Sequence, residues 1–92
     1  MKSYAVVDRF EGEFAVCEVE VLPIEESYVE DFFSKPTVMM DIPIIEIYNS
    51  IGDFQEGDIL IIEHNCERVI TIYSKDEEEK SRRIELLKQM IG

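Results

Sequence analysis

The sequence predicts a mainly β fold, at the margin of the α+β class, built as a small five-stranded antiparallel barrel of SH3-like or OB-like type. Two turn signals favour this fold: alternating apolar segments flank Gly12, and Glu56-Gly57-Asp58 directly precedes an apolar run over 59–62. The composition, 46% hydrophobic and 33% charged, is typical of a globular chain. A length of 92 residues predicts one domain over 1–92.

The first two strands are predicted over 3–10 and 13–22. Apolar residues alternate with glutamates in the second, as in a strand that buries one face, so Cys17 should point to the core. Gly12 supplies the positive φ of a tight hairpin turn. Asp8 or Glu11 could accept a backbone N–H there, and Asp does so more readily.

Residues 23–33 predict a short inserted helix. Pro23 fits the first helical position, and Glu25 and Glu26 place negative charge in the first turn. Apolar side chains then recur at a spacing of four residues. An extended excursion of the chain is the alternative.

A third strand is predicted over 37–42 and ends at Pro43. Residues 44–48 either continue it past a kink or form a helical turn, because periodicity does not decide so short a run. Residues 49–57 predict a loop with turns at Gly52 and Gly57.

The next strand, over 59–62, is apolar on both faces, so one face lines the interior and another element covers the second. Gly57 and Asp58 form the turn before it. The last strand is predicted over 68–73.

A C-terminal helix is predicted over 76–91. Ser74 and Glu77 fit a capping box, in which each side chain accepts a first-turn N–H. An apolar stripe follows on one side of the helix: Ile84, Leu86, Leu87, Met90 and Ile91. Since an isolated helix of this length is marginal in water, we expect the stripe to dock on the sheet.

The net charge of −12 argues against nucleic-acid and anionic-membrane partners, which Lys and Arg normally bind. It favours encounter with a basic partner. No apolar run approaches the roughly 18 residues of a membrane span, and Met1 leads directly into a strand rather than a signal peptide. We therefore expect a soluble, cytoplasmic protein.

Catalytic and metal motifs find little support. Cys17, Cys66 and His64 are too few for a zinc site, so we expect structural thiols, a polar strand-end histidine and no cofactor. The acids over 53–58 do not match an EF-hand, although a weak Ca²⁺ site stays open. Asp8, Arg9 and Glu11 form either an acid/base cluster or a surface ion pair.

Enzyme and nucleic-acid functions also find little support. No nucleophile elbow or phosphate-binding glycine loop is present, so we expect no enzymatic activity. Phe10, Phe14, Tyr48 and Tyr73 could stack bases, but the basic residues are scattered. The densest basic group is explained by helical pairs, Glu78–Arg82 and Glu79–Arg83.

Four segments, taken in order, resemble a small bacterial family catalogued as domain of unknown function 3006. They are the hairpin over 7–16, Asp41-Ile42-Pro43, the turn and strand over 56–60, and the charged helix over 76–87. The resemblance implies a small β-barrel with a C-terminal helix in a bacterial cytoplasm, and no activity. The chain departs from it by an insertion over 23–36.

These observations favour a non-enzymatic protein-interaction or regulatory module. Tyr28, Phe32 and Phe33 in the insertion would form its contact surface if exposed, or else would close one end of the barrel. Homodimerisation is a variant of this hypothesis. Weak divalent-cation binding and acidic mimicry of a nucleic acid, occupying a basic partner, are the alternatives.

Overall fold

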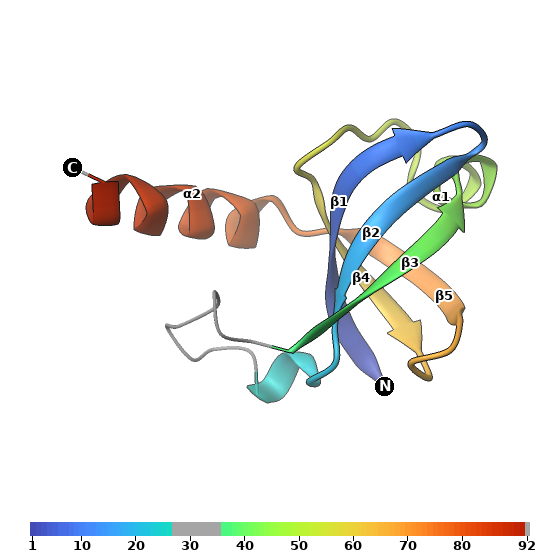
Figure 1. Ribbon diagram of the computed structural model, residues 1–92, viewed down its shortest axis with the longest axis horizontal. Coiled ribbons are helices and arrows are strands. Elements are labelled where there is room, and N and C mark those ends of the chain that lie inside the picture. The colour runs from blue at the N-terminus through green and yellow to red at the C-terminus, as the bar shows by residue number, and fades with distance from the viewer. Residues whose placement is uncertain (27–35, 92) are drawn as a thin grey trace.

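A computed structural model describes residues 1–26 and 36–91 and shows a five-stranded antiparallel sheet with two α-helices (Figure 1), as the predicted fold class requires. The inserted helix and its residues Tyr28, Phe32 and Phe33 lie outside the described residues, apart from a 3₁₀ turn, η1. The elements are β1 (Lys2–Glu11), β2 (Phe14–Glu20), η1 (Ile24–Glu26), β3 (Thr37–Pro43), α1 (Ile44–Ile51), β4 (Ile59–His64), β5 (Val69–Lys75) and α2 (Glu77–Ile91).

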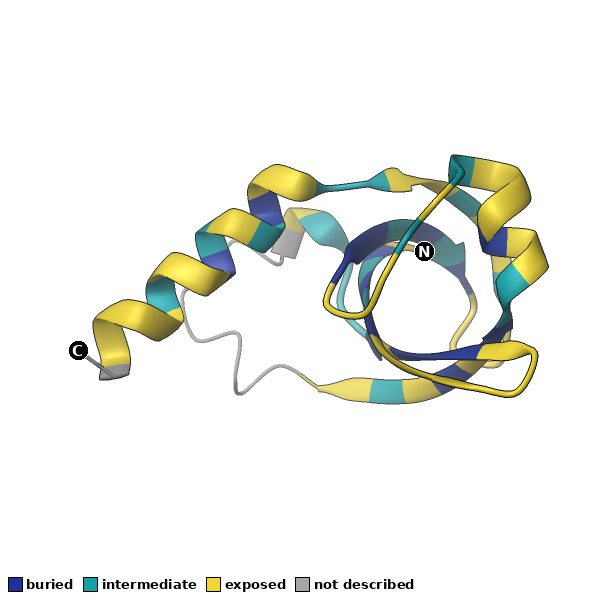
Figure 2. Cartoon of the chain, turned by 90° about the horizontal axis from the view of Figure 1, so that it is seen from above, coloured by how far each residue is buried: buried dark blue, intermediate teal, exposed yellow. Residues whose placement is uncertain are grey.

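The strands follow the order β3-β2-β1-β4-β5, with β1 in the centre. Ala5, for example, pairs with Val19 of β2 on one side and with Leu60 of β4 on the other. Seen from above, the strands wind around a common interior (Figure 2), and α1 contacts both edge strands, β3 and β5. The ladders within 1–26 and 36–91 do not join β3 to β5, so the closed SH3-like or OB-like barrel stays a prediction.

The core lies between the inner face of this curled sheet and α1. Leu60 and Ile62 of β4 are fully buried and Ile59 nearly so, which confirms the prediction of a deeply buried strand. From α1, Ile47 contributes a fully buried side chain. Cys17 is also fully buried, as its position in the alternating pattern predicted.

Residues 44–48, which the sequence left open, form the first part of α1. The helix continues to Ile51, so the predicted loop over 49–57 begins too early. Ile44, Ile47 and Ile51 recur at helical spacing and pack on the core, and this packing sustains the extra turn. Gly52, with a φ of 81°, ends the helix and donates its N–H to the Tyr48 carbonyl at 2.8 Å.

The predicted turns at Gly12 and Gly57 are confirmed by φ values of 59° and 89°. Asp58 closes the second turn, since its buried carboxylate accepts the Gln55 N–H at 2.8 Å. Pro43 ends β3 and precedes the first turn of α1.

The predicted capping box at Ser74 and Glu77 is wrong. Ser74 lies within β5, opposite Ile61, because that strand runs to Lys75. Asp76 takes the capping role instead, and its Oδ1 accepts the Glu79 N–H at 2.9 Å.

The expectation that the apolar stripe of α2 docks on the sheet is also wrong. α2 extends away from the strands (Figure 1), and the residues that it buries are Glu79 and Arg83 of its first two turns. Ile84, Leu87 and Met90 lie farther along the helix and are exposed. The periodicity correctly identified an apolar face of the helix, but most of that face lies beyond the edge of the sheet.

Replacing each candidate N-cap residue in turn tests whether Asp76, rather than Ser74, caps α2. We expect Asp76→Ala to lower the free energy of unfolding by about 1 kcal/mol, because it leaves a first-turn N–H without its acceptor. The exposed Ser74→Ala is expected to change it by less than about 0.5 kcal/mol. Urea unfolding of both variants measures the difference. A larger loss from Ser74→Ala would restore the original assignment.

Candidate interaction surface

A groove of about 710 Å³ lies where the β1–β2 turn meets the start of α1. Its lining residues are Glu13, Phe14, Pro43, Ile44, Ile45 and Tyr48. Two contacts build it: Pro43 pairs with Phe14 in the β2–β3 ladder, and Ile44 donates its N–H to the Glu13 carbonyl at 2.9 Å. These contacts fix the direction in which α1 leaves the sheet.

Three large apolar side chains of this groove face solvent. Ile45 is 62% exposed, Tyr48 53% and Phe14 42%. Ile45 and Tyr48 are three residues apart on α1, so they lie on one side of the helix, while Ile47 between them is fully buried. The same helix thus packs Ile47 into the core, with Ile44 and Ile51 beside it, and presents Ile45 and Tyr48 to solvent.

The groove has an acidic border. Glu13 lines it directly, whereas Glu46 lies on the opposite side of α1 and lines two neighbouring hollows. In the adjoining turn, the exposed Arg9 binds Asp8 at 2.5 Å and Glu11 at 2.8 Å. Of the two alternatives for these residues, the structure therefore shows the surface ion pair. The Asp8 side chain, which was predicted to cap the turn, is bound to Arg9 instead.

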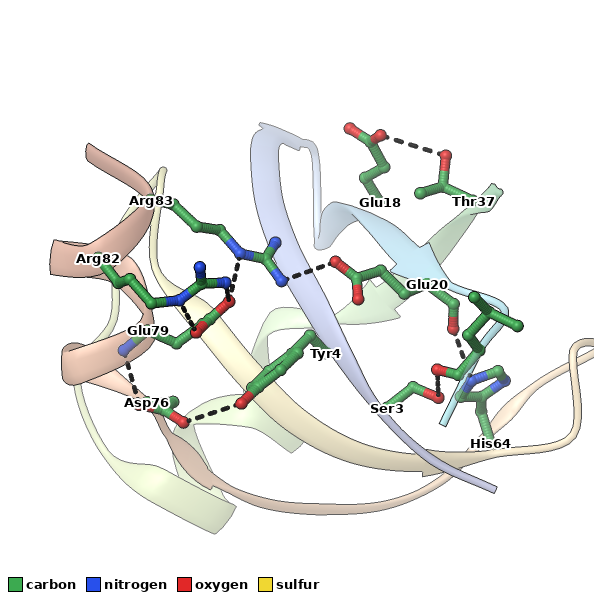
Figure 3. Close-up of polar contacts among 11 residues, drawn as sticks. Ser3, Tyr4, Glu18, Glu20, Thr37, His64, Asp76, Glu79, Arg82 and Arg83 are labelled. Atoms are coloured by element: carbon green, nitrogen blue, oxygen red, sulfur yellow. Dashed lines mark hydrogen bonds and ion pairs between the residues drawn. The ribbon is translucent and has the colours of Figure 1, made fainter. Parts of the chain in front are cut away.

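A second polar arrangement joins the root of α2 to the sheet (Figure 3). The Arg83 guanidinium lies 2.8 Å from Glu20 Oε2 and 2.7 Å from Glu79 Oε2, and its centre is 5.2 Å from the centroid of the Tyr4 ring. Arg82 binds both oxygens of Glu79, at 2.7 and 2.8 Å. The predicted Glu79–Arg83 pair is therefore confirmed, whereas Arg82 pairs with Glu79 rather than with Glu78.

Burial alone would raise the pKa of Glu79, but the hydrogen bonds from Arg82 and Arg83 outweigh it and hold the pKa below its ordinary value. Glu20 was not recognised from the sequence, because it shares the charged face of β2 with Glu18 and reads as a solvated residue. In the structure Glu20 is 3% exposed. Its partner follows 63 positions later in the chain, and no local spacing signals that pairing.

His64 ends β4, as predicted, and its side chain is fully buried. Its Nδ1 accepts the Cys66 N–H at 3.0 Å, and Nε2 lies 3.1 Å from the Glu20 carbonyl. This pairing selects the neutral tautomer with hydrogen on Nε2. Both ring nitrogens are used within the fold, which leaves neither for a metal ion.

The remaining candidate ligands are also held in structural roles. Burial raises the pKa of the Cys17 thiol to about 12. Cys66 is exposed, so the expectation of a core role is wrong for this cysteine. Asp58 of the suspected Ca²⁺ loop binds Lys80 at 2.8 Å. Over residues 1–26 and 36–91, no cluster of three or more His, Cys, Asp or Glu is arranged to hold a metal.

The aromatic residues considered for base stacking separate into two groups. Phe10 packs edge-on against Phe54, with their ring centroids 5.5 Å apart. The Lys2 ammonium lies over the Tyr73 ring, 4.7 Å from its centroid. Phe14 and Tyr48 meet at the groove instead. Their convergence depends on the path of α1 after Pro43, which the sequence left undecided.

Comparison of the chain with protein-family models, curated protein sequences and solved structures returns no match. The resemblance to domain of unknown function 3006 therefore stays a prediction. Within the described residues, neither helix has the length and apolar character to cross a membrane.

Removing the Arg83 guanidinium tests whether charge holds α2 to the sheet. We expect Arg83→Met to lower the free energy of unfolding by roughly 3–5 kcal/mol, because the buried carboxylate of Glu20 loses the guanidinium that lies 2.8 Å from it. Arg82→Met, at a more exposed position, is the matched control and should cost about 1 kcal/mol or less. Urea unfolding measures both.

The double variant Glu20→Leu, Arg83→Met should recover part of the loss, since it removes the buried charge of Glu20 together with that of Arg83. Equal losses from Arg82→Met and Arg83→Met would contradict a buried clamp.

The pH dependence of stability tests the neutral state of His64. Burial lowers the pKa of His64 below its ordinary value of 6.5, and this outweighs the opposing contact with the Glu20 carbonyl. As the pH falls, the unfolded chain takes up a proton before the folded chain does. The stabilisation is therefore complete above about pH 6.5 and is lost as the pH falls through the lower folded pKa.

We expect the free energy of unfolding to decline more steeply between about pH 6.5 and 5.5 in the wild type than in His64→Gln, whose side chain does not titrate. Paired urea titrations at each pH give both slopes. Parallel slopes would show that His64 is not held neutral in the fold.

Proposed function

We propose that the chain is a non-enzymatic protein-interaction module whose contact surface is the groove lined by Phe14, Ile45 and Tyr48. The supporting observation is that three large apolar side chains are exposed together around one cleft, where monomeric proteins usually avoid such patches. Aromatic side chains are enriched at protein interfaces, where they anchor into a partner. The bacterial cytoplasm belongs to the same proposal, through the family resemblance.

The non-enzymatic character is supported by where the shifted pKa values lie. Catalytic groups with perturbed pKa values normally converge in a cleft. In the described residues, Asp58 is held by Lys80, Glu79 by two arginines, and Cys17 by the core. Each of these three shifts thus has a structural cause away from the groove.

Matched baits test the proposal. The tagged wild type, the double variant Ile45→Ser, Tyr48→Ser and the control Ile70→Ser are used to capture proteins from the source cell. Ile70 is 55% exposed but lies on β5, outside the groove lining. We expect a protein retained by the wild type and the control and lost by the double variant, because only the latter removes the apolar anchors.

Two further measurements complete the test. The melting temperature of the double variant should stay near that of the wild type, since both side chains face solvent. Capture should also persist at about 1 M salt, where charge interactions are screened within about 3 Å. Capture that is unaffected by the double variant, or a collapse of its melting temperature, would reject the groove as the interface. Loss with salt alone would favour acidic mimicry.

A further inference from the structure

We infer that the groove takes a short segment of a partner protein in which apolar side chains lie between basic residues. This inference rests on the proposed function and adds the chemistry of the partner. It is carried by three features of the described residues: the charge around the groove, the use of its backbone groups, and its apolar lining.

The charge around the groove is negative and is not neutralised by the basic residues near it. Glu13 is the one charged residue among the described residues that line the groove. Arg9 already binds two carboxylates in the adjoining turn. Arg68 lines a neighbouring hollow together with three acidic residues: Asp41, Glu46 and Glu67. A basic segment would therefore be attracted to this face and an acidic one repelled.

Two residues of the groove lining, Pro43 and Ile44, have no backbone N–H available to a partner. The Ile44 N–H is bonded to the Glu13 carbonyl, and Pro43 has no N–H to offer. Adding a strand to a sheet edge requires a row of free backbone groups. The groove is therefore suited to hold side chains rather than to extend the sheet.

The lining determines which side chains fit. Phe14, Ile45 and Tyr48 present apolar surface, and a volume of about 710 Å³ falls within the range of roughly 300–1,000 Å³ that ligand-binding clefts span. Leucine or aromatic anchors bury this surface. An arginine beside them can lie over the exposed Tyr48 ring or pair with Glu13. Apolar contact supplies the affinity, and the flanking charges select the partner.

Fluorescence anisotropy with three labelled peptides tests the partner chemistry. The first has Leu-Trp-Leu between pairs of arginines, the second replaces the arginines by glutamates, and the third replaces Leu-Trp-Leu by serines. We expect the first peptide to bind the wild type, the second to bind roughly tenfold more weakly, and the third not to bind.

Variants locate the binding. Tyr48→Ser should weaken the first peptide at least tenfold, whereas Ile70→Ser should leave its affinity unchanged. The variant Glu13→Gln should narrow the difference in affinity between the arginine and glutamate peptides roughly twofold or more. Melting temperatures near that of the wild type show that each variant is folded.

The possible failures separate the two proposals. Equal affinity for the arginine and glutamate peptides, with loss in Tyr48→Ser, overturns the basic partner and leaves the groove as the interface. Binding of the serine peptide that disappears with salt also overturns it, because charge alone would then suffice. If none of the peptides binds at millimolar concentration, or if binding ignores Tyr48→Ser, the groove itself is overturned as the binding surface.

Discussion

The packing of α1 across both edge strands is the interaction on which the rest of the structure depends. Ile47 fills the core, with Ile44 and Ile51 packed beside it, and the helix covers a side of the curled sheet that would otherwise meet water. The bond from the Ile44 N–H to the Glu13 carbonyl ties its first turn to the opening hairpin. Because that orientation points Ile47 inward, it points Tyr48 outward, so the core and the groove are two consequences of one docking geometry.

The two helices are attached to the sheet by different physical means. α1 is held by apolar burial, whereas the buried contacts of α2 are ionic, with Arg83 between Glu20 and Glu79. A buried ion pair adds little net stability compared with an apolar contact, but it is demanding in geometry and in the identity of its members. The direction in which α2 leaves the sheet is thus fixed by ion pairs, from Arg83 to Glu20 and from Lys80 to Asp58, rather than by a broad apolar contact.

Local patterns in the sequence predicted much of the fold. Gly12 and Gly57 identified their turns because a positive φ is a property of the residue itself, and Cys17 was placed in the core by period-two alternation. The Glu20–Arg83 pair was missed because a glutamate on a strand face looks the same whether water or an arginine meets it. Most of the groove was missed because it arises where a turn and a helix converge in space. Tyr48 was noticed, but its partners and its role depended on how α1 leaves Pro43.

The central position of β1 also has a consequence for how the chain folds. Its pairing with β2 is a local hairpin, whereas its pairing with β4 joins Ala5 to Leu60, far along the chain. Closing so long a loop loses entropy before its contacts compensate, which makes such pairing the slow event in folding. During that interval the inner face of the hairpin, with Val7 and Cys17, is without the cover that β4 and α1 later supply. A nascent chain would therefore carry the apolar face of the β1–β2 hairpin uncovered until α1 and β4 have been synthesised.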